Sequence, residues 1–489
     1  MDLLRSIFWR GLRCPSRVAI VDDRRTYTFG RVLAGSLHMA GHIERETMQP
    51  NVGLMLPTSG AMAISLLGTW LAGRVAVPLN FLLSAEEICK VVDDSGIDTI
   101  FTVGPLMDLL GLAGKLPPRI KIVKIESLRF EGFPPLRWPG DFSDDDLAVI
   151  LYTSGTSGLP KGVMLTHGNL YSNVVDSIEH ANLKSVDTFL GVLPQFHSFG
   201  LTVLTLIPLY LGAKVVYTAR FVPKKLMQLM REHRPEVFIA VPSMYNALLG
   251  VKGVTADDFR SLRLPVSGGE PLPEVVYNTY LNQMNVKLLE GYGLTETSPV
   301  SNWSAPATAK RKSVGLPIPH VTVRIVDDEG RVVPAGQSGE ILIAGSNIMK
   351  GYYRRPAMTA EVMTQLEGKR YFKTGDIGHV DDEGFLFITG RKKEAMKIGG
   401  MLVFPRSIEE AINKHPTVKD SAVIGKSDPV RGEVAVAYVE LRDGQTFDEM
   451  SIRAFCREHL AQYKVPREIY PIPQLPRSPT GKILRRALK

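Results

Sequence analysis

Cysteine is scarce in this chain of 489 residues: Cys14, Cys89 and Cys456 lie far apart and form no CxxC or Cys/His spacing. Three scattered thiols exclude a disulfide framework and a zinc site, and they are typical of a reducing compartment. We therefore expect inert or buried thiols and a cytoplasmic location.

A membrane-spanning helix is not expected either. Thr188–Ala213 contains no Asp, Glu, Lys or Arg and is long enough to span a bilayer. It includes Pro194, His197 and Pro208, however, and these groups predict a buried loop followed by a core helix. Arginines interrupt the apolar residues of the N-terminus, so no secretory signal is predicted. We expect an amphipathic first helix packed on its own domain, with a membrane-surface helix as the alternative.

The chain has no strong excess of one charge. Its 58 Lys and Arg against 50 Asp and Glu leave a net charge of +8, which suits small polyanions. No dense basic run occurs before Lys482–Lys489, so nucleic-acid binding is not expected. The hydrophobic fraction of 44% supplies a large core and excludes global disorder.

Short β-branched runs alternate with helical segments up to about Ser313. Asn51–Leu56 and Arg74–Pro78 are predicted strands, and Ser59–Ala72 is a predicted helix between them. This order predicts parallel sheets covered by helices. Further on, Asp/Gly turns at 327–330 and 381–384 predict two β-hairpins, the first with arms Val321–Val326 and Arg331–Val333.

We therefore expect an α/β fold with two parts. Residues 1–390 form a large part with several α/β subdomains and a β-rich subdomain. Residues 391–489 form a small α+β domain, because the chain becomes basic and glycine-bearing at Gly390 and then continues for a plausible domain length.

The strongest local signal is YTSGTSGLPKG at 152–162, which directly follows the apolar run Leu147–Leu151. Glycines let the backbone approach an anion, and hydroxyls and a lysine add hydrogen-bond donors and charge. A flexible linker is the alternative, and a Walker A loop is excluded because Pro160 precedes the lysine and glycine follows it. The candidate phosphate ligands are Thr153, Ser154, Gly155, Thr156, Ser157, Gly158 and Lys161.

This loop resembles the phosphate-binding loop of the acyl-adenylate-forming superfamily, which includes acyl-CoA synthetases, firefly luciferases and peptide-synthetase adenylation domains. The resemblance covers nearly the whole chain. GYGLTET at 291–297 is similar to the family's second nucleotide motif. The resemblance implies that Tyr292 stacks on adenine, that Thr295 contacts the α-phosphate and that Glu296 binds Mg²⁺. It also implies a metal contact for Thr153, and places Gly291 and Gly293 in the nucleotide site.

Two further motifs complete the nucleotide site that the resemblance implies. SGGEPLP at 267–273 is similar to the loop that lines the adenine and acyl sites, which assigns Gly268, Gly269 and Glu270 to it. YFKTGD at 371–376 resembles the ribose motif, in which Asp376 accepts hydrogen bonds from both ribose hydroxyls. Arg391 would add a second ribose or phosphate contact.

The remaining candidates carry the two half-reactions of the family. GRKK at 390–393 resembles its hinge, and Lys393 is the residue that absorbs the domain rotation. Lys482 is similar to the lysine that contacts the carboxylate and α-phosphate during adenylation. Lys397 would face the site in the second conformation. Gly399 and Gly400 would line the path of the pantetheine, and His197 would orient or gate the acyl carboxylate or the thiol.

The resemblance implies an ATP-dependent ligase that forms an acyl adenylate and then an acyl-CoA thioester, with ATP, Mg²⁺ and CoA. The motifs are most similar to those of bacterial fatty acyl-CoA synthetases. One alternative is an acyl-ACP synthetase or fatty acyl-AMP ligase that loads a carrier protein. Others are a luciferase-like oxygenase and a non-catalytic nucleotide-binding module. Membrane contact would be peripheral at most.

Overall fold

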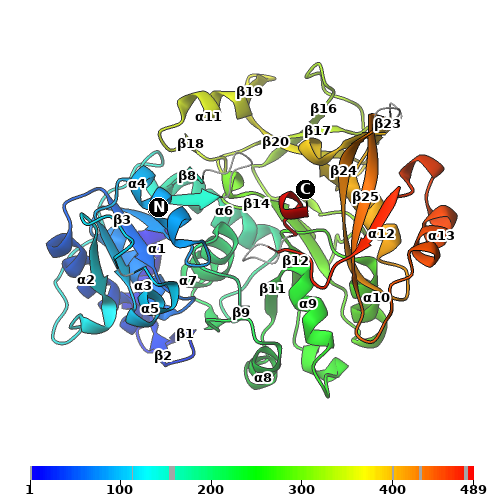
Figure 1. The fold of residues 1–489 in the computed structure, drawn as a ribbon. Coiled ribbons are helices and arrows are strands. Elements are labelled where there is room, and N and C mark those ends of the chain that lie inside the picture. The colour runs from blue at the N-terminus through cyan, green and yellow to red at the C-terminus, as the bar shows by residue number, and fades with distance from the viewer. Residues whose placement is uncertain are drawn as a thin grey trace.

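The computed structural model describes residues 3–112, 114–153, 160–398, 401–428, 432–477 and 483–488. Two large sheets occupy the centre, a third sheet lies above them, and a fourth lies at one side (Figure 1). This arrangement confirms the predicted α/β fold with a smaller C-terminal part.

The first sheet has seven strands in the order β18-β8-β7-β4-β3-β5-β6. Strands β7 to β6 are parallel, and β8 and β18 extend the edge in antiparallel pairing. The strands are β3 (Asn51–Met55), β4 (Val75–Pro78), β5 (Thr99–Thr102), β6 (Lys121–Lys124), β7 (Leu147–Thr153), β8 (Lys161–Thr166) and β18 (Gly351–Tyr352). The helices around it are α1 (Leu3–Arg13), α2 (Phe29–Glu46), α3 (Gly60–Leu71), α4 (Ala85–Ser95) and α5 (Gly104–Leu110).

The second sheet has nine strands in the order β15-β14-β13-β12-β11-β9-β10-β1-β2, with a parallel centre and antiparallel edges. The strands are β1 (Val18–Val21), β2 (Thr26–Thr28), β9 (Thr188–Gly191), β10 (Lys214–Tyr217), β11 (Val237–Ala240), β12 (Leu264–Gly268), β13 (Leu289–Gly293), β14 (Val300–Trp303) and β15 (Leu316–Pro317). Its helices are α6 (His167–His180), α7 (Ile207–Leu211), α8 (Pro223–His233), α9 (Pro242–Leu249) and α10 (Glu274–Gln283).

The segment Thr188–Ala213 folds as the strand β9, a loop, the buried π-helix η2 (Phe199–Leu206) and α7. This confirms the expected loop and core helix. Within the described ranges, no helix combines the length and the apolar character needed to cross a bilayer.

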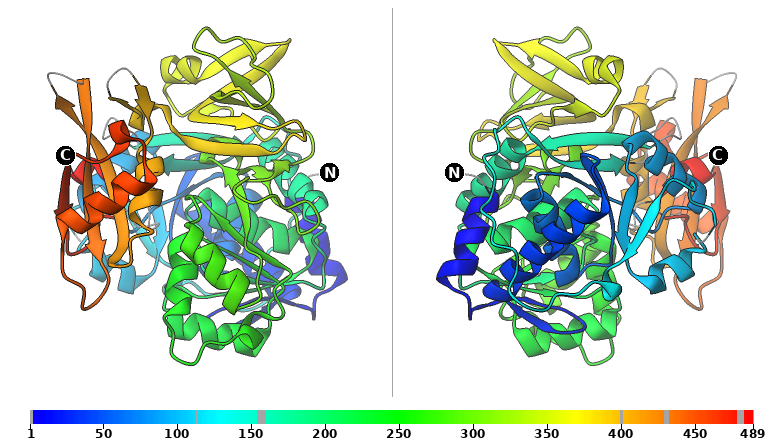
Figure 2. Two further views of the ribbon diagram at one scale, coloured as in Figure 1. Left: turned by 90° about the vertical axis from the view of Figure 1, so that its right-hand side faces the viewer. Right: turned by 90° about the vertical axis from the view of Figure 1, so that its left-hand side faces the viewer.

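The third sheet is antiparallel and lies above the two large sheets, shown in yellow in Figure 2. It consists of β16 (Thr322–Val326), β17 (Gly339–Ala344), β19 (Met363–Leu366), β20 (Lys369–Val380) and β21 (Leu386–Arg391), with helix α11 (Pro356–Val362) beside it. The predicted hairpin at 381–384 is confirmed, since β20 pairs with β21.

The hairpin predicted at 327–330 forms with a very short second arm. Val326 and Val332 form an antiparallel bridge, and the backbone N–H of Val333 donates to the carbonyl of Ile325 at 3.0 Å. The longer partner of β16 is β17. The short arm Arg331–Val333 is followed by Pro334, which has no N–H group and therefore cannot continue a ladder.

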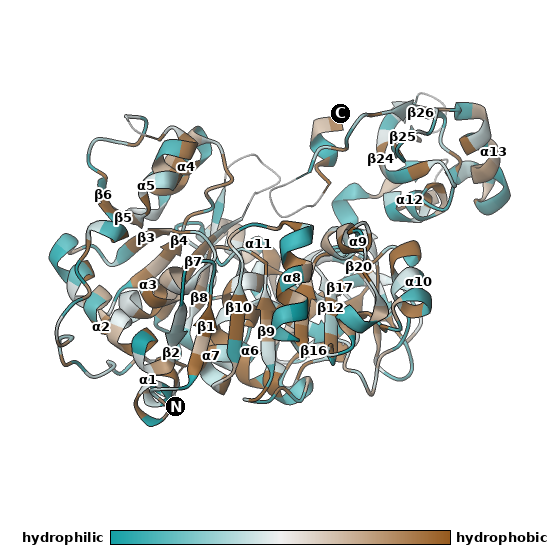
Figure 3. Ribbon diagram, turned by 90° about the horizontal axis from the view of Figure 1, so that it is seen from below, coloured by the Kyte–Doolittle hydropathy of each residue, from teal (hydrophilic) through white to brown (hydrophobic). Residues whose placement is uncertain are grey.

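The fourth sheet has its own hydrophobic core, which includes Met396, Ile408, Val423 and Cys456. It consists of β22 (Met396–Ile398), β23 (Met401–Val403), β24 (Val418–Asp428), β25 (Gly432–Leu441) and β26 (Glu468–Pro471), with α12 (Pro405–Ile412) and α13 (Glu449–His459). Viewed from below, this part stands beside the two large sheets (Figure 3). The boundary at residues 390 and 391 stays a prediction.

Candidate functional site

The predicted nucleotide motifs meet at the ends of neighbouring strands. Gly268 ends β12 and lies opposite Gly291 in the parallel register of β12 and β13, so the motifs at 267–273 and 291–297 are adjacent. Gly269 follows with a φ of +81° and turns the chain towards Glu270. Ligand sites of open α/β sheets form at such carboxyl ends of strands.

A polar cluster joins Tyr292 of β13 to the third sheet. The Tyr292 hydroxyl donates a hydrogen bond to Asp376 Oδ2 at 2.6 Å, and Arg391 Nε lies 3.1 Å from Asp376 Oδ1. Asp376 lies opposite Arg391 in the register of β20 and β21, and it is 4% exposed. The structure therefore brings these three predicted nucleotide ligands together.

The charges of this cluster support one another. Burial and the Asp376 carboxylate hold the pKa of Tyr292 well above its usual value, so its hydroxyl keeps its proton and remains a donor. The Asp376 carboxylate raises the pKa of Arg391 despite the opposing effect of burial. The cluster thus presents a fixed carboxylate beside a permanent cation.

A second cluster lies where β7 and β8 meet. Thr153 ends β7 opposite Lys161, the first residue of β8. The Lys161 ammonium lies 3.0 Å from Glu296 Oε1 and 2.5 Å from the Tyr352 hydroxyl, which itself donates to Glu296 Oε1 at 2.8 Å. The Thr153 hydroxyl is buried, and no other described residue forms a hydrogen bond with it. The predicted ligands Ser154, Gly155, Thr156, Ser157 and Gly158 lie outside the described residues.

Glu296 and Thr295 belong to the 3-10 helix η4 (Thr295–Thr297), and both are buried. Gly293 is required just before it, because a Cβ atom there would lie 1.8 Å from the carbonyl oxygen of Pro299. The Thr295 hydroxyl lies 3.3 Å from the hydroxyl of Ser198, which connects η4 to the loop that contains His197.

The loop of His197 also contacts the β12 motif. The backbone N–H of Phe199 donates to His197 Nδ1 at 3.3 Å. A Cβ atom on Gly268 would lie 3.1 Å from the Phe199 ring, so the ring rests against the glycine. His197, Thr295 and Gly268 therefore belong to one region of the structure, at the amino end of the apolar helix η2.

Of the C-terminal candidates, Lys393 and Lys397 are described, and neither forms a hydrogen bond or ion pair with the described residues of the two clusters. Lys397 is exposed in β22, and its side chain forms no hydrogen bond or ion pair with another described residue. Its backbone N–H donates to Glu433. Gly399, Gly400 and Lys482 lie outside the described residues. Lys393 lies in the 3-10 helix η5 (Lys392–Glu394), directly after β21.

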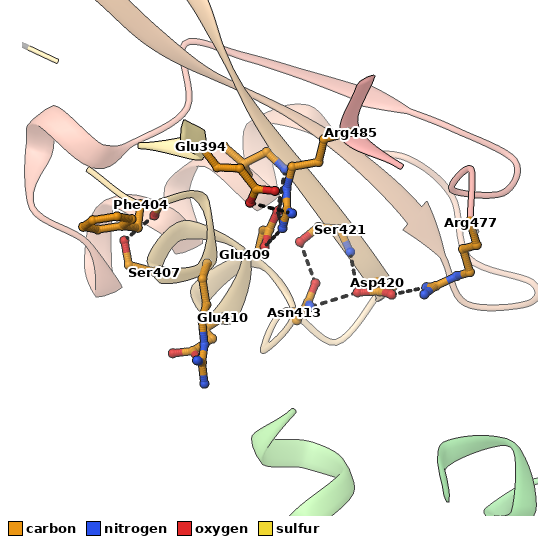
Figure 4. A network of polar contacts seen from close by, with 12 residues as sticks. Glu394, Phe404, Ser407, Glu409, Glu410, Asn413, Asp420, Ser421, Arg477 and Arg485 are labelled. Carbon is orange, nitrogen blue, oxygen red and sulfur yellow. Dashed lines mark hydrogen bonds and ion pairs between the residues drawn. The ribbon is translucent and has the colours of Figure 1, made fainter. Parts of the chain in front are cut away.

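A polar network flanks the segment that contains Lys482 (Figure 4). Arg485 forms hydrogen bonds with Glu409 at 2.8 and 2.9 Å and with Glu394 at 2.9 Å, and Arg477 forms an ion pair with Asp420. Arg477 and Ile483 form an antiparallel bridge. The described flanks of residues 478–482 are therefore held against each other and against α12 and β24.

Sequence reasoning missed Tyr352, Arg485, Glu409 and Glu394. Tyr352 belongs to GYYRR, a segment without hydrophobic period, and its partners lie 56 and 191 residues away. Glu409 lies on α12 beside charged residues that are typical of a protein surface, but its side chain is buried in the structure. No local pattern reports such contacts.

Comparison with known proteins adds independent evidence. The family model "AMP-binding enzyme" matches residues 7–353, and "AMP-binding enzyme C-terminal domain" matches residues 407–482. A long-chain-fatty-acid–CoA ligase of Bacillus subtilis (strain 168) is 31% identical, with 97% of this chain and 92% of the relative covered. A feruloyl-CoA synthase of Amycolatopsis sp is 32% identical, with 97% and 96% covered.

Among solved structures, ATP-bound MatB from Rhodopseudomonas palustris matches with a TM-score of 0.90 at 28% identity, covering 100% of this chain and 98% of that chain. The apo form of the same protein matches at 0.81, with equal identity and coverage. The arrangement of the present chain is thus more similar to the ATP-bound form of that protein.

Proposed function

We propose a function from the premise that the chain belongs to the AMP-binding enzyme family and is an ATP-dependent acyl-CoA ligase: it activates a fatty acid as the acyl adenylate and then forms the CoA thioester. The observation that carries the proposal is the meeting of two polar clusters, Tyr292–Asp376–Arg391 and Lys161–Glu296–Tyr352, at the strand ends.

In the first half-reaction, the acid carboxylate attacks the α-phosphorus of ATP and pyrophosphate leaves. Asp376 accepts hydrogen bonds from the ribose hydroxyls, and Arg391 adds a cation beside them. Lys161 and the loop that follows Thr153 bind the leaving phosphates. Lys482 brings the carboxylate and the α-phosphate together.

The oxygen atoms of Glu296 and Thr153 fit Mg²⁺. This ion takes oxygen ligands and is usually held by one or two protein groups together with substrate phosphates. The buried carboxylate of Glu296 and the buried hydroxyl of Thr153, to which no described residue hydrogen-bonds, satisfy that requirement. Bound there, Mg²⁺ would neutralise charge on the phosphate oxygens.

In the second half-reaction, the thiol of CoA attacks the acyl carbonyl and AMP leaves. For this step we propose that the C-terminal domain turns about Lys393 and brings Lys397, Gly399 and Gly400 to the site. The exposed position of Lys397 in the present arrangement is compatible with such a second arrangement.

A fatty acid is the proposed acid because the region beside His197 is apolar. Helix η2 carries seven buried residues and no charged residue, and the Phe199 ring separates it from Gly268. A site lined by such apolar residues would discriminate chain lengths weakly, at about 1–3 kcal/mol per methylene. The names of the relatives include both fatty and aromatic acids, so the experiment compares acids of both classes.

The test is pyrophosphate release with Mg-ATP and a panel of fatty and aromatic acids, each with and without CoA. Fatty acids should stimulate release, and CoA should be consumed in proportion to AMP formed. Release that stalls after one turnover and ignores CoA would identify another acceptor, such as a carrier protein. If no acid triggers release and Lys482→Ala behaves like the parent, the proposal is wrong.

A surface feature supports a peripheral position on a lipid membrane. We define the aromatic face as six exposed side chains on α1 and on the strap 129–138: Trp9, Leu12, Phe130, Phe133, Leu136 and Trp138. All exposed Trp and Phe side chains of the described ranges belong to it. Phe133 and Leu136 are 87% and 86% exposed, and helix α1 carries three arginines and no acidic residue.

We propose that the aromatic face contacts an anionic lipid surface, since Trp and Phe beside arginines are the composition of interfacial helices. The buried face of α1 packs on its own domain, as expected, so the contact uses its opposite side.

The test is sedimentation of the protein with phosphatidylglycerol vesicles. The apparent affinity for the vesicles should fall at least about tenfold for Phe133→Ser/Leu136→Ser. Leu109→Ser/Met450→Ser removes comparably exposed side chains elsewhere and should sediment like the parent. A parent protein that does not bind these vesicles contradicts the contact.

A further inference from the structure

Tyr352 reaches the phosphate cluster from a distant part of the chain. It belongs to the two-residue strand β18, which pairs with β8 so that Tyr352 lies opposite Val163. The next backbone N–H, that of Tyr353, donates to the carbonyl of Gly162 at 2.7 Å. The side chain of Tyr352 is 2% exposed, so both its backbone and its ring are fixed beside Lys161.

The Tyr352 hydroxyl connects two groups of opposite charge. It carries one proton, and its contact with the Glu296 carboxylate at 2.8 Å uses that proton, because a carboxylate can only accept. The contact with the Lys161 ammonium at 2.5 Å therefore runs the other way, with Lys161 as the donor.

The cluster leaves Glu296 with two partners of different kinds. Lys161 Nζ lies 3.0 Å from Glu296 Oε1 and 4.1 Å from the centre of the Tyr352 ring, so the ammonium is shared between the carboxylate and the tyrosine. A triphosphate bound at the neighbouring loop would compete with Glu296 for the same ammonium. When Lys161 turns to phosphate, Tyr352 is the partner that remains on the carboxylate.

We infer that Tyr352 is a positioning residue: its hydroxyl holds the Glu296 carboxylate in the orientation that binds Mg²⁺ while Lys161 binds phosphate. The inference rests on the proposed function only through the role of Glu296 as metal ligand. It adds a residue that no motif of the nucleotide site contains, and it assigns the β18 segment to the assembly of the metal site.

The test is the binding of ATP to the purified protein, measured by calorimetry with and without Mg²⁺. Tyr352→Phe removes one oxygen atom and keeps the buried ring. We expect the apparent affinity for Mg²⁺ to fall about tenfold, because one hydrogen bond to a charged group is lost. ATP binding without Mg²⁺ should stay within about twofold of the parent, since Lys161 is retained. In pyrophosphate exchange, the KM for Mg²⁺ should rise more than kcat falls.

Tyr353→Phe is the matched control. This neighbouring hydroxyl accepts a hydrogen bond from Asn51 Nδ2 at 3.1 Å and does not contact Glu296. Equal losses of Mg²⁺ affinity in the two variants would show a general structural effect and overturn the inference. So would an unchanged Mg²⁺ affinity in Tyr352→Phe.

Glu296→Gln separates this inference from the proposed function. If Glu296 binds the metal, Tyr352→Phe should add little to the loss already caused by Glu296→Gln. A full additional loss would mean that Tyr352 acts independently of Glu296, which contradicts the inference. If Glu296→Gln leaves Mg²⁺ affinity unchanged, the metal role proposed for Glu296 fails, and the inference fails with it. A protein that binds Mg-ATP as expected but activates no acid would refute the proposed function alone.

Discussion

Asp376 is a residue whose function depends on its two neighbours. Tyr292 donates to one of its oxygens and Arg391 contacts the other, so the carboxylate is oriented from both sides. The sequence motif YFKTGD identified the aspartate through a resemblance, but it did not reveal this support. Single side chains are predictable from motifs, whereas their contacts depend on segments far apart in the chain.

Asp376→Asn should weaken ATP binding by about 2–3 kcal/mol, or roughly 30- to 150-fold, because the ribose loses a charged acceptor and Arg391 loses its counter-ion. Equilibrium titration with ATP measures the change. Asp381→Asn is the control, since Asp381 lies in the turn after the same strand and pairs with Lys310. An affinity within about twofold of the parent would argue against ribose binding by Asp376.

His167 is a buried histidine outside the proposed site. Its ring stacks on Phe142 with 4.1 Å between the ring centres, and within the described ranges neither ring nitrogen has a hydrogen-bond partner. Burial lowers the pKa of His167 to about 4, against the opposing charge of Asp146. The unfolded chain therefore binds more protons than the folded protein between about pH 6.5 and 4. Stability contributed by the neutral ring is complete above that window and is lost as the pH falls through it.

His167→Phe should flatten this pH dependence. The parent's free energy of unfolding should decrease by up to about 3 kcal/mol over the window, and the variant should lose correspondingly less. Thermal midpoints measured from pH 7 to pH 4 provide the comparison. His459→Phe, on the exposed side of α13, should follow the parent. A parallel decline in His167→Phe would assign the acid sensitivity to other groups.

At the scale of single elements, local signals predicted the structure well where they acted within a few residues. The helix predicted over Ser59–Ala72 forms as α3, and Ser59 caps it by accepting a hydrogen bond from the backbone N–H of Met62. The arm Arg331–Val333 pairs across its turn but stays short, and β16 has its longer partner in β17, which no adjacent turn signals. Strand pairing over long sequence distances has no local signature.

Helix α12 contains a buried carboxylate that secures the C-terminal segment. Burial raises the pKa of Glu409, while the guanidinium of Arg485 opposes that shift. Arg485→Met removes the partner and leaves Glu409 buried without its counter-ion. We expect the C-terminal domain to lose about 3–5 kcal/mol of stability. Urea unfolding followed by limited proteolysis of residues 391–489 measures it.

The double variant Glu409→Leu/Arg485→Met should recover most of that loss, because an apolar pair of similar volume avoids the unpaired charge. Arg486→Met, the adjacent and exposed arginine, is the matched control and should be neutral. Pyrophosphate release should follow the same order if the segment that contains Lys482 depends on this anchor. Equal stability of Arg485→Met and Arg486→Met would contradict the role of the network.

At the scale of the whole molecule, the sequence predicted which segments form parallel sheets but not how the sheets assemble. β18 joins the first sheet from a segment that follows the second, and β1 and β2 complete the second sheet from the N-terminus. The placement of β18 beside β8 brings Tyr352 to Lys161. The family hinge implies two domain arrangements, and the sequence does not say which one the chain adopts. The higher TM-score to the ATP-bound neighbour than to its apo form identifies the arrangement seen in this structure.

Arg391 and Lys392 form ion pairs with the large part directly beside the boundary, and one further ion pair of the described residues joins the two parts away from it. Lys414, just after α12, lies 3.2 Å from Glu274 at the start of α10. The bond to Lys414 lowers the pKa of Glu274. Both side chains are partly exposed, so the pair contributes about 1 kcal/mol at most. That is small for folding, but it is sufficient to shift a balance between two domain arrangements about fivefold.

Glu274→Lys should therefore disfavour this arrangement and lower pyrophosphate release relative to thioester formation from supplied acyl adenylate. The exchange Glu274→Lys/Lys414→Glu restores the attraction and should restore the ratio. Glu449→Lys makes the same charge change within α13, where Glu449 pairs with Arg453 of the same helix, and should leave the ratio unchanged. The ratio of the two half-reactions in all three variants is the measurement. If Glu274→Lys and Glu449→Lys change it equally, the effect is one of net charge, and the pair does not select between arrangements.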